Sequence, residues 1–550
     1  MFDVLVVGSG LAGLSAALEA KKAGLSVAVM TKGNPFRSNS SMASGGINAA
    51  LGTAEPDLPS LHAQDTIAGA DGLSGEAAVR FLCENGPKTV QMLDALGAGF
   101  DRDEKGRIAQ RSFGGAGRKR TCYIQDKTGA GLVQALMRAC NEAGVVTLSN
   151  HYLLSLLTRK NRISGVCALK QADSSVVAIE AKSVVLAGGG YAGVYFGHTT
   201  NPASTGGDIL AAAFRAGLRL VNMEFVQFHP TGLEGSGELV SEAVRGEGGY
   251  LILEDGSRFT DELQTRDKLA REIARAIEAG HRVFVDVRHL GEELIQSRLP
   301  TFRRAAMTKL GLDPVSEPVP IRPSAHYTMG GIETDAEGQT AIGGLFACGE
   351  CAYNGVHGAN RLGGNSLLEA AVFGQLAGKK AASFAKHHAL AGVDEGQLTE
   401  QRTRTERILG GESRFNINAL RKSLGKTLTL KAGIFRDSHG LNDALDYIEY
   451  LHTLAGGLHC VDKGRSNNVE LVMILEFLSA LEVAEVTVLA ALKRKESRGA
   501  HYRIDYPQHD DKFRKNSYST LKGGHYYDVQ LLKPGGFEWW LDRVRKALIN

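Results

Sequence analysis

The first 32 residues carry the feature that most limits how this chain of 550 residues can fold. An apolar run from Val4 to Val7 leads into Gly8-Ser9-Gly10-Leu11-Ala12-Gly13, and a helical pattern and a second apolar run follow. Strand, glycine turn, helix and strand in this order form a dinucleotide-binding unit, whose helix N-terminus supplies amide donors to phosphate groups. Gly8 allows the tight turn, Gly10 admits the pyrophosphate, and Gly13 lets the helix pack on the sheet. A glycine-rich turn without a ligand is the less favoured interpretation.

The second apolar run ends at Met30-Thr31-Lys32, without the acidic residue that holds a ribose hydroxyl in nicotinamide enzymes. This pattern indicates another dinucleotide. Two later apolar runs, Ser183 to Gly190 and Gly344 to Glu350, also end in glycines. Because these turns lie so far apart, we expect one α/β dinucleotide domain interrupted by an insertion, as in FAD enzymes of the two-dinucleotide-binding type.

Composition excludes several classes of function. The chain has 63 Lys and Arg against 60 Asp and Glu, and a net charge of +3 argues against nucleic acid or an anionic membrane as a partner. Its seven cysteines are scattered, so we expect a reducing, cytoplasmic compartment and no disulfide framework. Cys348 and Cys351 form a CxxC without a second pair nearby. This absence argues against a zinc site, so we interpret both as core residues and expect no bound metal, with a thioredoxin-like role as the weaker alternative.

The chain shows no signal-peptide pattern, and its most apolar late segment, 471–492, contains three glutamates. Charged residues are costly in a bilayer, so we expect no direct membrane span.

Longer motifs stand in and after the expected insertion. They are NMEFVQFHPTGL (222–233), LVSEAVRGEGGYL (239–251), TRDKLAREI (265–273), SAHYTMGGI (324–332) and NGVHGANRLGGNSLLEA (354–370). With these motifs the chain resembles the succinate dehydrogenase/fumarate reductase flavoprotein family, to which L-aspartate oxidase also belongs. The resemblance runs from Met1 to about Pro507, where ESRGAHYRIDYP (496–507) is similar to the family's C-terminal signature.

The resemblance implies a fold of three parts and an extension. A Rossmann-like FAD-binding domain occupies 1–220 and 336–385, and an α+β capping domain that holds the substrate, 221–335, interrupts it. A helical domain, 386–500, and a C-terminal extension, 501–550, follow. The sequence supports the helical part, because a basic last turn, Lys493 to Lys495, precedes Gly499 as a helix C-terminus requires.

Isolated histidines and arginines suit a dicarboxylate substrate, which needs two anion sites. His229, His326, Arg266 and Arg361 stand in glycine-flanked motifs. Fixed imidazole and guanidinium donors can bind both carboxylates and polarise a C=C bond toward hydride attack. A lone histidine in an apolar run is more often a core residue with satisfied hydrogen bonds, and we interpret His357 in that way.

The resemblance also implies roles. Arg266 matches the family's proton donor, and Glu242 and Arg245 match the relay that feeds it. His229, Ser241, His326 and Arg361 match substrate-binding residues, with Ser241 where the family commonly has Thr. A guanidinium is ordinarily never deprotonated, so a neighbouring glutamate has to return its proton at once. The alternative is that Arg266 acts mainly as an electrostatic clamp.

One position separates the branches of the family. Phe113 stands where fumarate-type enzymes have Phe, whereas aspartate oxidases carry an acidic residue there that could meet the substrate ammonium. No acidic residue occurs between Gln110 and Ile124. The sequence therefore favours fumarate and succinate over aspartate, and L-aspartate oxidase is the alternative function.

The segment RSNSSMASGGINAA (37–50) is similar to the one that wraps the FAD in this family. Its third residue is a flavin-linking histidine in membrane-bound relatives and Asn39 here, so the resemblance implies non-covalent FAD. Because a histidyl link raises the flavin potential in this family, its absence favours fumarate reduction. The FAD-binding residues implied by the glycine turn and by the resemblance are Gly8, Ser9, Gly10, Ala12, Gly13, Thr31, Lys32, Ser38, Asn39, Ser44, Gly45, Gly46, Asp208, Glu350, Ser366 and Leu367.

The sequence indicates that a partner protein supplies the electrons for the flavin. No cysteine cluster for iron–sulfur or haem ligation stands in the sequence, so we expect an iron–sulfur partner subunit, with or without a further electron-donor subunit. Such partners could hold the chain at the inner face of the cell membrane. A non-enzymatic FAD-binding assembly subunit is a further alternative, which intact Arg266, His229, His326 and Arg361 disfavour.

Overall fold

The computed structural model describes residues 1–522 and 526–532. Strand β1 (Phe2–Val7), helix α1 (Leu11–Lys21) and strand β2 (Val27–Thr31) form the predicted first unit. Among the described residues their sheet has seven strands in the order β6-β2-β1-β9-β8-β7, with β16 paired to β9. Its other strands are β6 (Val146–Ser149), β7 (His151–Arg159), β8 (Arg162–Lys170), β9 (Ser175–Leu186) and β16 (Leu345–Ala347). Because β16 returns in parallel register beside β9 after a long excursion, the expected interrupted α/β fold is confirmed.

Close backbone contacts fix the turn after β1. Gly8 has φ +119°, and a Cβ there would lie 2.2 Å from the carbonyl oxygen of Ala187. A Cβ on Gly13 would lie 2.0 Å from the carbonyl oxygen of Gly8. Helix α11 (Asn365–His387) packs on α1 through Gly378, whose Cβ would lie 2.2 Å from the carbonyl oxygen of Ala16. Side chains at these glycines would push the N-terminus of α1 away from the sheet edge.

Short elements complete this part of the molecule. Helices α3 and α4 pack together, and α5 packs on α1. The helices are α2 (Asn39–Met42), α3 (Pro59–Gly69), α4 (Glu76–Ala95), α5 (Thr128–Glu142) and α6 (Asp208–Arg215), and a small sheet contains β3 (Ile47–Asn48), β4 (Gln110–Arg111) and β5 (Thr121–Cys122).

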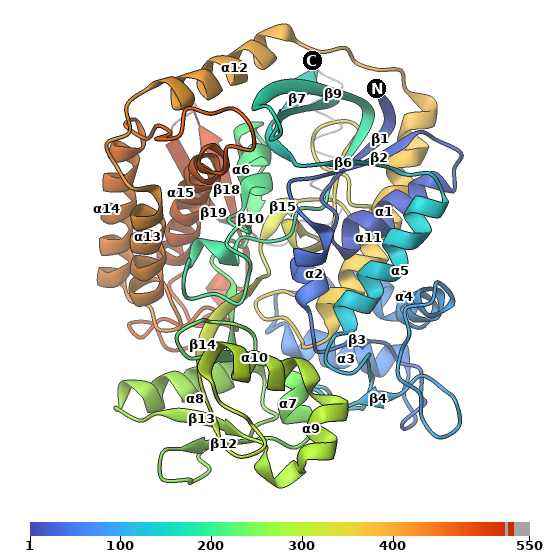
Figure 1. Ribbon diagram of the computed structural model, residues 1–550, viewed down its shortest axis with the longest axis vertical. Coiled ribbons are helices and arrows are strands. Elements are labelled where there is room, and N and C mark those ends of the chain that lie inside the picture. The colour runs from blue at the N-terminus through green and yellow to red at the C-terminus, as the bar shows by residue number, and fades with distance from the viewer. Residues whose placement is uncertain (523–525, 533–550) are drawn as a thin grey trace.

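The excursion forms a separate body at the lower end of the molecule (Figure 1). Its sheet has the order β11-β14-β13-β12, and side chains such as Ile273, Val285 and Phe302 form a core of its own. The strands are β11 (Val226–Leu233), β12 (Tyr250–Leu253), β13 (Val283–Asp286) and β14 (Val319–Thr328), and the helices are α7 (Glu242–Gly246), α8 (Arg266–Glu278), α9 (Glu292–Arg298) and α10 (Pro300–Leu310). We keep the name capping domain for this body.

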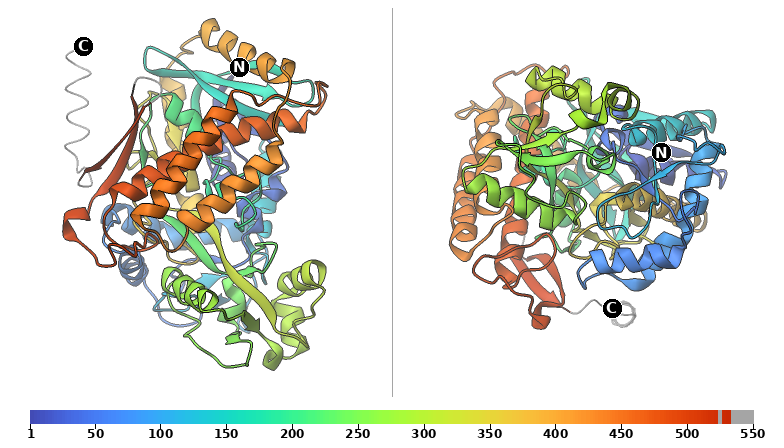
Figure 2. Two further views of the ribbon diagram at one scale, coloured as in Figure 1. Left: turned by 90° about the vertical axis from the view of Figure 1, so that its left-hand side faces the viewer. Right: turned by 90° about the horizontal axis from the view of Figure 1, so that it is seen from below.

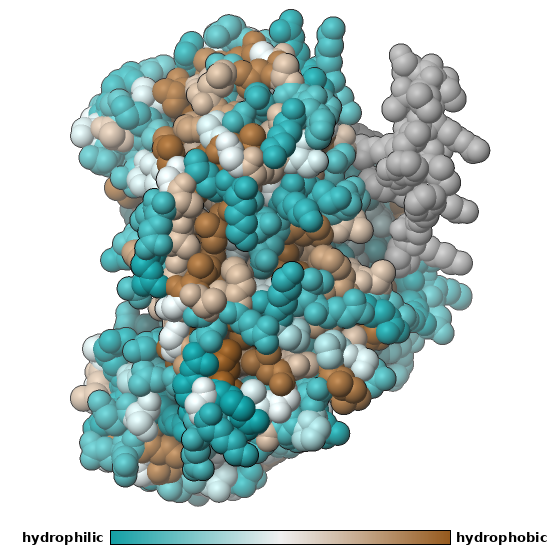
Figure 3. Space-filling model, turned by 90° about the vertical axis from the view of Figure 1, so that its right-hand side faces the viewer, coloured by the Kyte–Doolittle hydropathy of each residue, from teal (hydrophilic) through white to brown (hydrophobic). Residues whose placement is uncertain are grey.

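The predicted helical part contains α12 (Glu395–Gly410), α13 (Ile417–Lys431), α14 (Ser438–Ala455) and α15 (Val469–Lys493). Helices α13, α14 and α15 pack together along one side of the molecule, whereas α12 lies against β7 and β9 (Figure 2). Glu482 of α15 pairs with Arg215 of α6 and joins this layer to the rest. Among the helices that the structure describes, none has the length and apolar character to cross a membrane. Figure 3 shows one face of the molecule, on which hydrophilic and hydrophobic residues are mixed.

The C-terminal signature is held by buried ion pairs. Arg494 contacts Glu224 at 2.7 Å and Glu496 at 3.0 Å, and all three side chains are buried. Beyond them, the hairpin of β18 (Asn516–Lys522) and β19 (Tyr526–Leu532) extends a sheet of β17 (Ala352–Tyr353), β15 (Gly331–Glu333) and β10 (Leu220–Val221). The rest of the predicted extension, 533–550, lies outside the described residues.

Candidate active site

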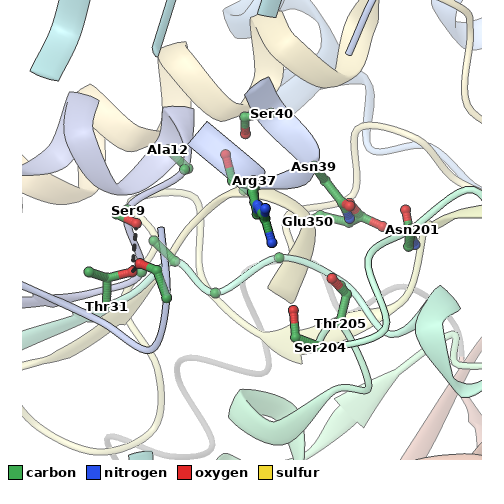
Figure 4. Close-up of a pocket in the computed structure, with 18 of the residues that line it drawn as sticks. Ser9, Ala12, Thr31, Arg37, Asn39, Ser40, Asn201, Ser204, Thr205 and Glu350 are labelled. Carbon is green, nitrogen blue, oxygen red and sulfur yellow. Dashed lines mark hydrogen bonds between the residues drawn. The ribbon is translucent and has the colours of Figure 1, made fainter. Parts of the chain in front are cut away.

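A cavity of about 680 Å³ lies at the C-terminal edge of the parallel sheet, beside the turn between β1 and α1 (Figure 4). Ligands of open α/β sheets bind at this edge. The cavity is lined by twelve of the residues predicted to bind FAD: Gly8, Ser9, Gly10, Ala12, Thr31, Lys32, Ser38, Asn39, Asp208, Glu350, Ser366 and Leu367.

The cavity walls offer polar groups suited to a dinucleotide. Helix α1 begins after Gly10 at the cavity wall, and its first amide, the N–H of Leu11, donates to Ser40 Oγ of the same wall at 3.1 Å. The N-terminus of a helix stabilises phosphate groups. Ser9 Oγ donates to Thr31 Oγ1 at 2.8 Å at the same end. Asn201 also lines the cavity, and its buried Nδ2 has no partner among the described residues. A long ligand with polar groups at both ends fits these walls.

Lys32 occupies the place where a nicotinamide enzyme has an acidic residue. Its Nζ lies 3.0 Å from Asp208 Oδ1 and 3.0 Å from Glu476 Oε1 of α15. Burial alone would lower the pKa of Lys32, but these two carboxylates outweigh burial and raise the pKa above its ordinary value. Lys32 therefore stays charged and joins β2, α6 and the helical layer at the cavity wall.

The other four predicted FAD residues do not line this cavity. Gly13 serves the packing of α1, as described above. Ser44 Oγ donates to the carbonyl of Met42 at 3.2 Å. A Cβ on Gly45 would lie 2.7 Å from the ring of Phe113, and one on Gly46 would lie 2.4 Å from Thr121. The segment thus passes from the cavity wall to the side chains predicted to bind substrate.

Arg266 and Glu242 form the centre of those side chains. Arg266 is the first residue of α8, and its Nε and Nη2 donate to Glu242 Oε2 at 2.9 and 2.6 Å. Glu242 Oε1 accepts from the backbone N–H of Gly114 at 2.6 Å. Burial would raise the pKa of Glu242, but the adjacent Arg266 and Arg245 outweigh burial and lower it. Glu242 is therefore a buried carboxylate with both oxygens engaged.

Arg245 lies next to this pair without a hydrogen bond to it. Its Nη1 donates to the carbonyl of Glu262, and its Nε and Nη2 have no partner among the described residues. Burial, followed by the charge of Arg266, lowers the pKa of Arg245 even though Glu242 acts in the other direction. In the predicted relay, hydrogen bonds thus connect Arg266 to Glu242, whereas none connects Glu242 to Arg245.

His229 and His326 face each other, with ring centroids 4.9 Å apart. They come from neighbouring strands β11 and β14, and β-bulges on either side of His229 change the pairing register there. His326 Nδ1 contacts Thr200 Oγ1 at 2.7 Å, and His229 Nδ1 contacts the backbone of Thr231. Burial, and then the charge of Arg266, hold both pKa values well below the usual range. Both rings are neutral and keep Nε2 free of hydrogen bonds from described residues.

Arg361 closes the cluster from the opposite side. Its Nη1 donates to Ser366 Oγ at 2.9 Å and its Nη2 donates to Gln227 Oε1 at 3.0 Å. The guanidinium carbon lies 4.1 Å from the ring centroid of Tyr327, a cation–π contact. Burial, followed by the charge of Arg266, lowers the pKa of Arg361 to about 9. Because Ser366 lines the cavity, Arg361 stands between the cavity and Arg266.

Phe113 and Ser241 complete the predicted substrate residues. Phe113 is 3% exposed, and its ring lies close to Gly45 and Gly363. Ser241 is the N-cap of α7, and its Oγ accepts from the backbone N–H of Ala243 at 3.2 Å. A Cβ on Gly363 would meet Glu242, Phe113 and Arg266 together. The cluster therefore places an apolar ring beside buried cations.

Comparisons with known proteins agree with this geometry. Residues 3–367 match the FAD binding domain family, and residues 421–532 match the fumarate reductase flavoprotein C-terminal family. A succinate dehydrogenase flavoprotein subunit of Rickettsia bellii is 38% identical over 93% of this chain and 91% of its own. The chain belongs to the succinate dehydrogenase/fumarate reductase flavoprotein family.

Two further relatives of this flavoprotein carry the names of different enzymes in the family. A chain of E. coli quinol fumarate reductase superposes with a TM-score of 0.92 at 33% identity, covering 97% of this chain and 96% of that chain. An L-aspartate oxidase of Streptomyces coelicolor is 40% identical over 92% of this chain and 89% of its own. The relatives of this chain thus include both a fumarate reductase and an L-aspartate oxidase.

Sequence reasoning missed three residues of this flavoprotein site and misjudged a fourth. Gln227 bonds both Arg266 and Arg361, Thr200 contacts His326, and Tyr327 lies under Arg361. Gln227 could have been found, because it is a polar residue two positions before His229 in an apolar strand. His357 is buried, but neither ring nitrogen has a partner among the described residues, so the interpretation as a satisfied core histidine was wrong.

Across the described residues, no group of three or more His, Cys, Asp or Glu side chains could hold a metal ion. Cys348 and Cys351 are both buried, and Cys351 Sγ lies 3.3 Å from the carbonyl oxygen of Leu186.

Proposed function

We propose that this chain is the catalytic flavoprotein subunit of a fumarate reductase/succinate dehydrogenase that interconverts fumarate and succinate. The observation that supports this most is the convergence of Arg266, Arg361, His229 and His326 beside the cavity. The guanidinium of Arg361 and the imidazoles of His229 and His326 can bind the two carboxylates, Arg266 lies close enough to act on the carbons between them, and the phenyl ring of Phe113 offers those carbons an apolar wall.

Each residue then has a role in the reaction. Bound FAD supplies the hydride. Arg361 and the two neutral imidazoles bind the carboxylates and polarise the C=C bond toward the hydride. Arg266 gives a proton to the other carbon, and Glu242, which accepts two hydrogen bonds from the same guanidinium, passes on a replacement proton that comes from solvent through Arg245. Arg245 feeds Glu242 once their open contact closes, and the clamp role of Arg266 remains the alternative.

We further propose that FAD is held without a covalent bond. The twelve cavity residues make the contacts, and Asn39, one of them, presents a carboxamide that cannot form a histidyl link. In this family that link raises the flavin potential, so its absence supports fumarate reduction as the favoured direction.

L-Aspartate oxidase is the second candidate, because one relative of that name is 40% identical. A bound aspartate would need a partner for its ammonium group. In the cluster the nearby carboxylate is Glu242, whose oxygens already accept from Arg266 and Gly114. This favours a substrate without an ammonium group. A purely structural FAD-binding role would leave these buried charges without a use.

We propose that the chain assembles with an iron–sulfur partner subunit. We also propose that it lies in the cytoplasm and reaches the membrane only through partner subunits. The relatives named above support this, since one is called a subunit and another comes from a quinol fumarate reductase.

One experiment tests the function and its rival together. The purified holoprotein is assayed anaerobically with a reduced viologen dye and fumarate, and aerobically with L-aspartate while peroxide is followed. We expect dye oxidation that depends on fumarate and little peroxide. Strong aspartate-dependent peroxide formation would move the assignment to L-aspartate oxidase.

A further inference from the structure

Gln227 joins the two arginines of the substrate cluster. Its side chain lies on β11 and is fully buried. Oε1 accepts from Arg361 Nη2 at 3.0 Å and from Arg266 Nη1 at 3.4 Å. Arg266 starts α8 of the capping domain, whereas Arg361 precedes α11 of the FAD-binding domain. One carboxamide oxygen therefore touches the cations from both bodies.

The orientation of this carboxamide is fixed by its other end. Nε2 donates to Asn360 Oδ1 at 2.8 Å and to the carbonyl of Arg361 at 2.8 Å. A flipped amide would place its NH₂ against two guanidiniums, which are donors only, and its oxygen against two acceptors. Oε1 therefore faces the arginines.

Asn360 continues the connection back to the capping domain. Its Nδ2 donates to Asp267 Oδ1 at 3.0 Å, and Asp267 is the residue after Arg266 in α8. Gln227 and Asn360 thus hold the start of α8 and the backbone of Arg361 from adjacent sides. The two contacts together limit sliding of one body against the other at the cluster.

The charges of the two arginines explain why a neutral acceptor suits this position. Arg266 and Arg361 are buried cations that repel each other, and the repulsion is stronger away from water. A neutral acceptor attracts both guanidiniums without neutralising them, whereas a carboxylate at the same place would compete with a dianionic ligand. A carboxamide keeps the cations close and still available.

We propose that Gln227 is a positioning residue that sets the separation and aim of Arg266 and Arg361 across the junction of the two domains, so that both reach the same dicarboxylate. This proposal rests on the proposed function above. Gln227 acts through the arginines, since both ends of its side chain are already engaged by protein groups.

The first test replaces Gln227 by Met, which keeps the length of the side chain and removes both hydrogen-bonding ends. Gln401→Met is the matched control, since Gln401 is another buried glutamine, in α12 of the helical part. Each variant is measured for FAD content, dye-linked fumarate reduction and malonate binding, seen as a change in flavin absorbance. We expect Gln227→Met to keep its FAD and to lose about 10–100-fold in kcat, because small misplacements of reacting groups are costly. The control should match the parent protein.

The second test adds a negative charge at nearly constant shape and also replaces the donor Nε2 by an oxygen. Gln227→Glu should pair with both guanidiniums while its second oxygen faces the acceptors of Asn360 and Arg361, and it should weaken malonate binding at least tenfold more than Gln227→Met does. A side chain that only fills space would produce no such order between the two variants. The order therefore separates positioning of cations from simple packing.

Two outcomes would overturn the proposal. One is a flavin-loaded Gln227→Met protein with the kcat and malonate affinity of the parent. The other is a Gln227→Glu protein that binds malonate normally, a result that remains informative even if Gln227→Met does not fold. Malonate binding requires no turnover. A parent protein that binds malonate but reduces no fumarate would therefore contradict the proposed function and leave the test of Gln227 intact.

Discussion

The cavity proposed for FAD and the cluster proposed for the substrate lie side by side and use different chemical groups. The cavity walls are glycine backbone, short polar side chains and charged groups of both signs, with Lys32 and Arg37 beside Asp208 and Glu350. The cluster has three buried guanidiniums, Arg245, Arg266 and Arg361, and one buried carboxylate between them, Glu242. The charges of the cavity are therefore mixed, whereas the cluster has an excess of positive charge.

This difference shows what each region needs from its ligand. Uncompensated buried charge is costly, so the cluster is least stable when empty and gains most from a dianion. The cavity contains no such imbalance, and its binding energy comes from many contacts of similar strength. A single substitution in the cluster should therefore change binding or turnover strongly, whereas a single substitution in the cavity should change FAD binding only slightly.

The largest effect is expected for Arg266→Ala. Loss of a positioned proton donor costs about 10²–10⁴-fold in rate, so kcat for fumarate should fall by that factor. FAD content should stay unchanged, because Arg266 does not line the cavity. Dye-linked turnover and flavin absorbance of the same sample provide both values. Arg266→Lys should recover a little activity if proton donation is the role, and near-normal turnover by Arg266→Ala would exclude that role.

Arg361→Ala should weaken binding and turnover together, since its guanidinium contacts substrate in both the ground state and the transition state. We expect malonate binding to weaken by about 10–100-fold, the range for a lost charge-assisted pair. The measurement is a flavin-absorbance titration. An unchanged dissociation constant would remove Arg361 from the clamp.

Glu369 on α11 precedes the cavity residue Ala370 and allows a test through pH. Its Oε1 accepts from Asn354 at 2.6 Å, its Oε2 has no partner among the described residues, and burial raises its pKa from 4.5 to about 8. The unfolded chain loses this proton at lower pH than the folded chain does. The free energy of unfolding therefore falls as pH rises from about 4.5 to about 8, and the penalty is complete above that window.

Glu369→Gln removes this titration and keeps the acceptor for Asn354. We expect the variant to be more stable than the parent at pH 9, by about 1–3 kcal/mol, and nearly equal to it at pH 5. Denaturant unfolding of both proteins at the two pH values measures the difference. The same offset at both values would contradict a buried, titrating Glu369.

The smallest effect is expected for Asn39→Ala. One hydrogen bond contributes about 0.5–1.5 kcal/mol, so FAD affinity should fall by less than about tenfold. Denaturant should release all FAD from both the variant and the parent into the supernatant. Yellow colour that remains with the parent protein on a denaturing gel would contradict a non-covalent flavin.

Local patterns in the sequence predicted much of the fold. Apolar runs that end in glycines predicted the strands and turns of the interrupted sheet, and the helical period predicted α12 to α15. These features depend on neighbouring residues, so their signal is contained in a short segment. Family motifs led to Arg266, Glu242, His229, His326 and Arg361, which the structure brings together.

Contacts between distant segments could not be predicted in this way. Lys32 pairs with Glu476 of α15, and Arg494 pairs with Glu224, although nothing in their local sequence indicates the partner. Gln227 accepts hydrogen bonds from arginines in two other segments, and the periodicity of the sequence does not predict such contacts. The packing of whole domains decides these pairs, and packing becomes visible only when the chain is folded.

We propose that a positively charged clamp with an apolar end lies beside the flavin. The most direct measurement titrates the oxidised holoprotein with malonate, succinate and L-aspartate and follows the flavin absorbance. We expect saturable changes with malonate and succinate, and binding of L-aspartate at least tenfold weaker, since its ammonium would face Phe113 and buried guanidiniums. Tighter binding of L-aspartate than of succinate, or no response to either dicarboxylate, would contradict this proposal.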